Sequence, residues 1–121
     1  MTIINRDQTE PFTTADGSTI REFLNPRNSE IQNQSLAEAI LSPEQSTAAH
    51  FHPRAEEIYF ILAGAGTMTI EGETRKVTVG DAIAIPSGQI HRIINDGEVE
   101  LRFLCCCAPA YSHDDTVLVE N

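Results

Sequence analysis

The chain has 121 residues, of which 40% are hydrophobic and 21% are charged. This length fits one domain, and the composition is typical of a folded globular protein. Eighteen acidic residues against eight basic ones give a net charge of −10, which argues against nucleic acid or an anionic membrane surface as a partner. Because the sequence shows no apolar run of membrane-spanning length and no signal peptide, we expect a cytoplasmic location.

The first 28 residues are polar, are interrupted by prolines and a glycine, and carry only short apolar patches. We expect them to form an N-terminal arm with short edge strands. Residues 29–41 give conflicting signals. The segment SEIQNQSLAEAIL contains helix-forming Leu, Ala and Glu, but its alternation over residues 36–41 also fits a strand that is buried on both faces.

From Thr47 onward the chain reads as short strands separated by turns. The turn signals are Glu71-Gly72, Pro86-Ser87-Gly88 and Asp96-Gly97. They separate predicted strands at residues 57–63, 67–70, 77–79, 81–85, 91–94 and 99–107. Many short strands at this spacing predict an all-β sandwich or small barrel.

Three cysteines are consecutive, at Cys105, Cys106 and Cys107. Neighbouring residues on a strand point to opposite faces, so these thiols cannot easily bridge one another. We expect free thiols in a reducing compartment, which serve as small hydrophobic strand residues rather than as metal or redox groups.

The histidines carry the strongest chemical signal. His50 and His52 are two residues apart, so on a strand both imidazoles point to the same face. Glu57 follows after a proline, and His91 begins another predicted strand. An isolated His-x-His pair usually binds nothing, but three imidazoles and one carboxylate suit a single divalent transition metal. Residue type does not choose among Fe, Mn, Ni, Zn and Cu.

Two segments resemble the two motifs of the cupin superfamily. The first is EQSTAAHFHPRAEEIYFILAG at residues 44–64, and the second is GDAIAIPSGQIHRIIN at residues 80–95. The matching positions are His50, His52, Glu57 and Gly64 in the first motif, and Gly80, Pro86, Gly88, His91 and Asn95 in the second. The first motif departs from the family at Glu44, which stands where a glycine is expected and leaves the turn geometry open.

The resemblance implies a double-stranded β-helix, which is the cupin or jelly-roll barrel, with the metal inside. It implies that residues 29–121 form a single cupin barrel domain with a C-terminal tail, and it favours a strand at residues 34–41. The spacing to Gly64 selects Glu57 rather than Glu56 as the acidic ligand. The resemblance also implies a homodimer.

Strand parity extends the site into a predicted small-molecule pocket. If Glu57 and His91 point inward, their alternate neighbours on the same strands do so too, and Ile83 and Ile85 share one face that we expect to form the floor. The predicted lining residues are Tyr59, Ile61, Ile83, Ile85, Gln89 and Ile93.

The resemblance to cupins implies several chemistries at such a site. We expect a metal-dependent enzyme that acts on a small oxygenated organic molecule, with Glu57 as a candidate general base. Dioxygenase chemistry and isomerase or cyclase chemistry both remain open. The alternative is a non-catalytic module that binds a small molecule.

Overall fold

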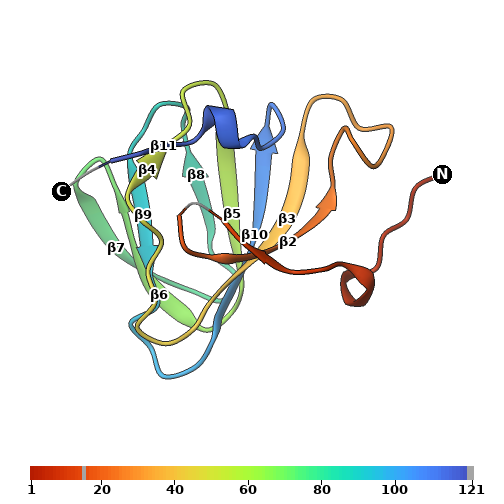
Figure 1. The fold of residues 1–121 in the computed structure, drawn as a ribbon. Helices are drawn as coiled ribbons and strands as arrows, with labels where there is room; N and C mark the ends of the chain where they lie inside the picture. The colour runs from red at the N-terminus through yellow and green to blue at the C-terminus, as the bar shows by residue number, and fades with distance from the viewer. Residues whose placement is uncertain (15, 120–121) are drawn as a thin grey trace.

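Two antiparallel β-sheets face each other and enclose the hydrophobic core (Figure 1). The structure is a computed structural model and describes residues 1–14 and 16–119. The larger sheet has six strands. In spatial order these are β1 (Phe12–Thr13), β2 (Thr19–Leu24), β3 (Ser35–Leu41), β10 (Leu101–Ala108), β5 (Glu56–Ala63) and β8 (Ala82–Ile85).

The smaller sheet has five strands and carries most of the turns. In spatial order these are β11 (Val117–Leu118), β4 (His50–Phe51), β9 (His91–Ile94), β6 (Ala65–Ile70) and β7 (Glu73–Thr78). Two 3₁₀ helices, η1 (Arg6–Gln8) and η2 (His113–Asp115), lie near the two ends of the chain. This strand order confirms the predicted all-β class and the double-stranded β-helix.

The segment with conflicting signals is the strand β3. It pairs with β10 on one side and with β2 on the other, so its residues gain two ladders of hydrogen bonds. Ala39 and Leu41 are buried in the core, and Glu38 is buried on the opposite face. These long-range pairings outweigh the local helix propensity of the segment.

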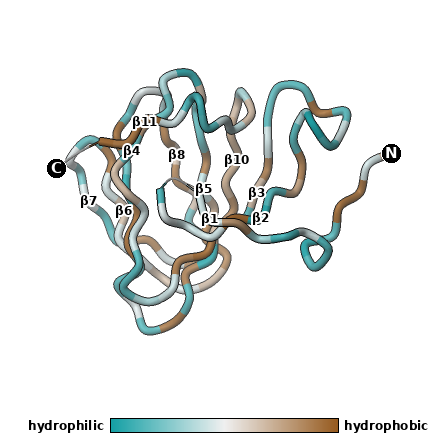
Figure 2. Tube along the Cα trace, viewed as in Figure 1, coloured by the Kyte–Doolittle hydropathy of each residue, from teal (hydrophilic) through white to brown (hydrophobic). Residues whose placement is uncertain are grey.

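The core fills the space between the sheets with aliphatic and aromatic side chains. Leu41, Ile61, Ile93 and Leu101 are completely buried, and Phe103 is 1% exposed. Polar residues dominate the loop that joins β2 to β3 (Figure 2). The hydrophobic core therefore lies between the sheets and away from this loop.

Two positions of the first motif have left-handed backbone conformations. Gly64 has a φ of +81°, and a Cβ atom there would lie 2.5 Å from the carbonyl oxygen of Glu100, so only glycine fits. Glu44 has a φ of +72°, and its amide donates a hydrogen bond to the carbonyl oxygen of Asn95 at 2.8 Å. The turn therefore keeps a glycine-like conformation although a glutamate occupies it.

Among the described residues, neither 3₁₀ helix is long and apolar enough to cross a membrane, and no other helix is present.

Candidate metal centre

Strand pairing brings the three histidines together. His50 in β4 lies directly opposite His91 in β9, and His52 follows His50 by two residues on the same side. Glu57 reaches the same space from β5 and is buried, whereas Glu56 is exposed. The inward direction that spacing predicted for Glu57 agrees with this arrangement.

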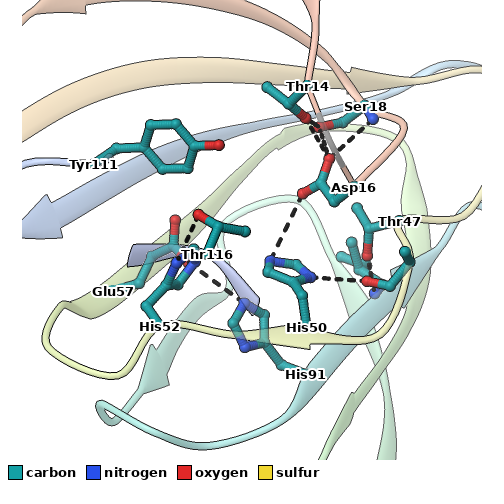
Figure 3. A network of polar contacts seen from close by, with 12 residues as sticks. Thr14, Asp16, Ser18, Thr47, His50, His52, Glu57, His91, Tyr111 and Thr116 are labelled. Atoms are coloured by element: carbon teal, nitrogen blue, oxygen red, sulfur yellow. Dashed lines mark hydrogen bonds and ion pairs between the residues drawn. The ribbon is translucent and has the colours of Figure 1, made fainter. Parts of the chain in front are cut away.

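The four side chains meet in a compact buried cluster (Figure 3). The ligating atoms of His50, His52 and His91 all lie within 4.8 Å of one another. Oε1 of Glu57 lies 3.4 Å from Nε2 of His52 and 3.5 Å from Nε2 of His91. The structure thus brings together all four residues that the sequence predicts as metal ligands.

Backbone carbonyl groups fix the tautomer of each histidine. Nδ1 of His50 lies 2.8 Å from the carbonyl oxygen of Ala48, and Nδ1 of His91 lies 3.0 Å from that of Gln89. Nδ1 of His52 lies 3.1 Å from the carbonyl oxygen of Asp115. A carbonyl oxygen only accepts, so each Nδ1 donates and each Nε2 keeps a free lone pair.

Two buried polar atoms in the cluster have no hydrogen-bond partner. They are Oε1 of Glu57 and Nε2 of His91. Burying such atoms without a partner costs free energy, and native proteins rarely leave them unsatisfied. A divalent cation between them would satisfy both, and imidazole and carboxylate donors suit transition metals. The residues present therefore fit a metal ion.

The cluster is electrostatically coupled. Burial raises the pKa of Glu57, but the interactions with His52 and His91 outweigh burial and lower this pKa to about 2. Burial, together with repulsion from His91, lowers the pKa of His50. Burial also acts to lower the pKa of His52, but Glu57 outweighs it and raises that pKa.

A cysteine orients the carboxylate. The thiol of Cys107 donates a hydrogen bond to Oε2 of Glu57 at 3.1 Å. Burial, followed by the charge of Glu57, raises the pKa of Cys107, so the group remains a protonated donor. The sequence predicted only a small hydrophobic strand residue at this position. Its alternation with the core residue Phe103 was the one signal that it points inward.

The segment after β10 also forms part of the site, and this role was not predicted from the sequence. The carboxylate of Asp115 accepts hydrogen bonds from the backbone amides of Arg54 and Ala55 at 3.0 and 2.9 Å. Its carbonyl oxygen holds Nδ1 of His52, and the ring of Tyr111 packs edge-on against His52. This segment therefore fixes one of the three imidazoles.

A pocket beside the β1–β2 hairpin opens onto the cluster. One wall comes from the β1–β2 hairpin, whose even-numbered residues from 12 to 22 face inward. Other walls come from β3, β5 and β10 and from Tyr111. The lining residues include Phe12, Thr14, Asp16, Ser18, Ile20, Glu22, Tyr59, Phe103 and Cys105.

Of the predicted pocket residues, Tyr59 lines this cavity, and the others do not. Ile61, Ile85 and Ile93 are core residues, and Ile83 packs against the core. Gln89 contributes its carbonyl oxygen to His91 rather than its side chain to the cavity. Parity predicts the face of a strand but not which strands border the cavity. Ile85 and Ile83 lie in register with Glu57 and Tyr59, but on β8, at the edge of the sheet farthest from the β1–β2 hairpin.

The fold and the histidine cluster define a small β-barrel protein with a candidate metal centre. The model of the cupin domain family matches residues 37–107, which is more than half of the chain. The chain therefore belongs to the cupin family.

Known proteins resemble the chain over nearly its whole length. Protein MJ1618 of Methanocaldococcus jannaschii is 47% identical over 114 residues, which are 94% of this chain and 91% of the relative. The polyketide cyclase RemF from Streptomyces resistomycificus superposes with a TM-score of 0.84 at 24% identity, over 100% of this chain and 87% of its own. A predicted oxalate decarboxylase from Thermotoga maritima gives a TM-score of 0.80 at 24% identity, over 89% of this chain and 99% of its own.

Proposed function

We propose that the protein holds one divalent transition-metal ion (Fe, Mn, Ni, Zn or Cu) through His50, His52, His91 and Glu57. The observation that carries the proposal is the set of three Nε2 atoms with free lone pairs beside the unpartnered Oε1 of Glu57. Such an ion, when bound, acts as a Lewis acid that polarises an oxygen atom of a ligand.

We further propose that the protein is an enzyme that acts on a small oxygenated organic molecule in the adjoining cavity. The cavity reaches three of the four proposed ligands, so a molecule in it would lie beside the ion. A polyketide cyclase and a predicted oxalate decarboxylase share this fold, and both names denote chemistry on oxygen-bearing molecules. The cyclase among these neighbours favours cyclase or isomerase chemistry, and dioxygenase chemistry is the alternative that a bound iron or copper ion would favour.

The chain's own groups would prepare the reaction. The backbone carbonyls hold the imidazoles in one tautomer, and Cys107 holds the carboxylate of Glu57. Aromatic and aliphatic walls exclude water and so strengthen electrostatic interactions inside the cavity. Burial, followed by the charge of Glu57, raises the pKa of Tyr59 well above its ordinary value, so its hydroxyl is available as a donor.

The first experiment is elemental analysis of untagged protein that is purified without nickel resin or chelator. We expect close to one equivalent of a transition metal. Iron or copper would direct the search to oxygen consumption with phenols and diketones, whereas zinc would direct it to cyclase and isomerase reactions. A protein that contains no metal and takes up none on reconstitution would overturn the metal centre and leave a ligand-binding module.

A matched pair of variants tests the ligand assignment. His52→Ala should abolish metal binding but leave a folded barrel, because one imidazole of the cluster is lost. His113→Ala is the control, since His113 is exposed on η2 and bonds only to Tyr111 in its own segment. Full metal occupancy in His52→Ala would show that the ligands are assigned wrongly.

We also propose a cytoplasmic homodimer that has no nucleic-acid or membrane partner. The outer face of the six-stranded sheet exposes Ile58 and Phe60, which are 52% and 40% accessible. These residues pair in register with Cys106 and Leu104, so the apolar surface continues onto β10. A second copy would cover it, and the free thiols fit a reducing compartment. A monomeric mass in solution scattering at micromolar concentration would contradict the dimer.

A further inference from the structure

The cavity beside the candidate metal centre has an unusual charge pattern. The chain has eight basic residues, but none of the described residues that line this cavity is a lysine or an arginine. Its charged lining residues are the carboxylates of Asp16, Glu22 and Glu57. An anion entering the cavity would find no side-chain cation to replace its lost hydration.

The nearby arginines are engaged elsewhere. Arg6, Arg21 and Arg102 converge on Glu38, on the outer face of the sheet. Arg27 lies outside the cavity, in a surface hollow that adjoins its mouth, and forms an ion pair with Glu22 at 3.3 Å. That pairing offsets the charge of Glu22, so Asp16 and Glu57 are the two carboxylates that act on a molecule inside.

Asp16 is held in one orientation (Figure 3). Its Oδ1 accepts hydrogen bonds from the hydroxyl of Thr14 at 2.5 Å and from the hydroxyl and amide of Ser18 at 2.6 and 3.0 Å. Its Oδ2 lies 3.7 Å from Nε2 of His50, the nitrogen that faces the candidate ion. One oxygen of Asp16 is fully engaged, and the other is presented to the cluster.

Asp16 borders the metal cluster rather than completing it. Asp16 approaches only one of the histidine nitrogens, at 3.7 Å, whereas Oε1 of Glu57 lies 3.4 and 3.5 Å from two of them. Its free oxygen can therefore accept a hydrogen bond from a molecule in the cavity. The charges of a divalent ion and of the carboxylates of Glu57 and Asp16 sum to zero. An anion that enters the cavity would therefore gain little electrostatic attraction to the site, but it would still lose its hydration.

We propose that this cavity selects neutral aromatic or apolar molecules that bear a hydroxyl group, and that Asp16 is the residue that rejects carboxylate anions. The proposal rests on the proposed metal centre. The apolar walls, which include Phe12, Ile20 and Phe103, would pack against the body of the molecule. A hydroxyl group would donate to Oδ2 of Asp16, whereas a carboxylate would only accept and would be repelled.

Salicylamide and salicylate test this directly. They share the ring and the phenol group and differ in a neutral carboxamide against a carboxylate. Zinc-loaded protein should bind salicylamide at least tenfold more tightly than salicylate in isothermal titration calorimetry. Asp16→Asn keeps the shape of the side chain and removes its charge, so it should reduce that preference at least fivefold. Glu98→Gln removes one charge from an exposed turn and should leave the preference unchanged.

The outcomes separate the two proposals. If wild-type zinc-loaded protein binds salicylate more tightly than salicylamide, or binds neither probe, the proposed selectivity is overturned. Neither outcome requires a variant. An unchanged preference in a folded Asp16→Asn variant would overturn the role of Asp16. Failure of the wild-type protein to take up zinc, nickel, iron, copper or manganese would overturn the metal centre itself, and the selectivity with it.

Discussion

Glu38 and Glu57 are both buried glutamates of the six-stranded sheet, 2% and 6% exposed, but they have opposite surroundings. Glu38 faces outward, and both of its oxygens accept hydrogen bonds from Nε of Arg6 at 2.9 Å. Arg21 and Arg102 add longer contacts at 3.9 Å. Glu57 faces inward among histidines, and its Oε1 has no hydrogen-bond partner.

The difference separates a structural carboxylate from a functional one. The charge of Glu38 is matched by cations of the same chain, and both of its oxygens have hydrogen-bond partners. At Glu57, by contrast, the carboxylate oxygen Oε1 and the neighbouring Nε2 of His91 both lack a hydrogen-bond partner. A cation between them would satisfy both atoms. Burial alone would not distinguish these two residues, whereas the identity of their neighbours does.

The largest expected effect is on metal affinity. Glu57→Gln removes the only charged ligand, so affinity should fall by a factor on the order of 100 or more, beyond the loss typical of groups that only support a ligand. Glu38→Gln should leave affinity unchanged. Competition with a chromophoric chelator measures both variants, and equal affinities would remove the functional distinction between the two glutamates.

The second effect reverses the comparison. Glu38→Gln should lower the free energy of unfolding of the metal-free protein by about 1–3 kcal/mol, because charged hydrogen bonds to Arg6 are weakened. Urea denaturation measures this change. Added metal should raise the melting temperature of this variant and of wild type alike, but should have little effect on Glu57→Gln. A metal response that is lost in Glu38→Gln would contradict this.

Acid titration sharpens the comparison through Glu57. Its pKa in the folded metal-free protein is about 2, below the ordinary value near 4.3. The ionised group therefore contributes stability above its unfolded pKa, and that contribution is lost as pH falls from about 4.3 toward 2. Urea midpoints across this range should fall steeply in wild type and less steeply in Glu57→Gln. Identical slopes would show that Glu57 is not coupled to the histidines.

Cys107 should have a smaller effect, since it supports a ligand and would not itself bind the metal. Cys107→Ala removes the thiol that donates to Glu57 and should weaken metal binding about tenfold. Cys107→Ser keeps a donor and should recover most of the loss. Cys106→Ala is the control, because Cys106 points away from Glu57 and contacts Gln34. Equal affinities of the alanine variants would remove the orienting role.

The smallest effect concerns a third glutamate, Glu44, which is exposed and differs from both in that its backbone is left-handed. Glu44→Gly should remove the strain and raise the free energy of unfolding by about 0.5–1 kcal/mol after the greater chain entropy of glycine is included. Thermal unfolding measures the gain, with Glu44→Ala as a control that should give none.

Local pattern and spacing predicted most of the fold and the centre of the site. The predicted strand at residues 91–94 has the same boundaries as β9. The predicted strand at residues 57–63 begins one residue later than β5. The resemblance to the cupin motifs also identified the four side chains that converge. Strand parity alone places His50 and His52 on one face, whereas the pairing of β4 with β9 brings in His91. The choice between helix and strand for residues 29–41 was made by the resemblance to cupins and not by local pattern. The strand β3 is stabilised by β2 and β10, and β10 is distant in the chain.

The surroundings of the site were beyond such reasoning. Asp115 contacts His52 across 63 residues, and Cys107 contacts Glu57 across 50. No local period connects such pairs, and only the closure of the barrel brings them together. Residues 1–28 were expected to form an arm with short edge strands. The strands β1 and β2 do lie at the edge of the larger sheet, but Asp16 and its hairpin also form a wall of the cavity. Parity within a strand also did not indicate which strands border the cavity.

The contact between His52 and Asp115 has a consequence for the order of events during protein synthesis. A ribosome adds about 5–20 residues per second, so the carbonyl group that orients His52 is made about 3–13 s after the imidazole itself. His52 lacks this partner throughout that interval, whereas the partners of His50 and His91 lie two residues before each of them in the chain. The orientation of His52 therefore has to wait until Asp115 has left the ribosome and β11 has docked beside β4.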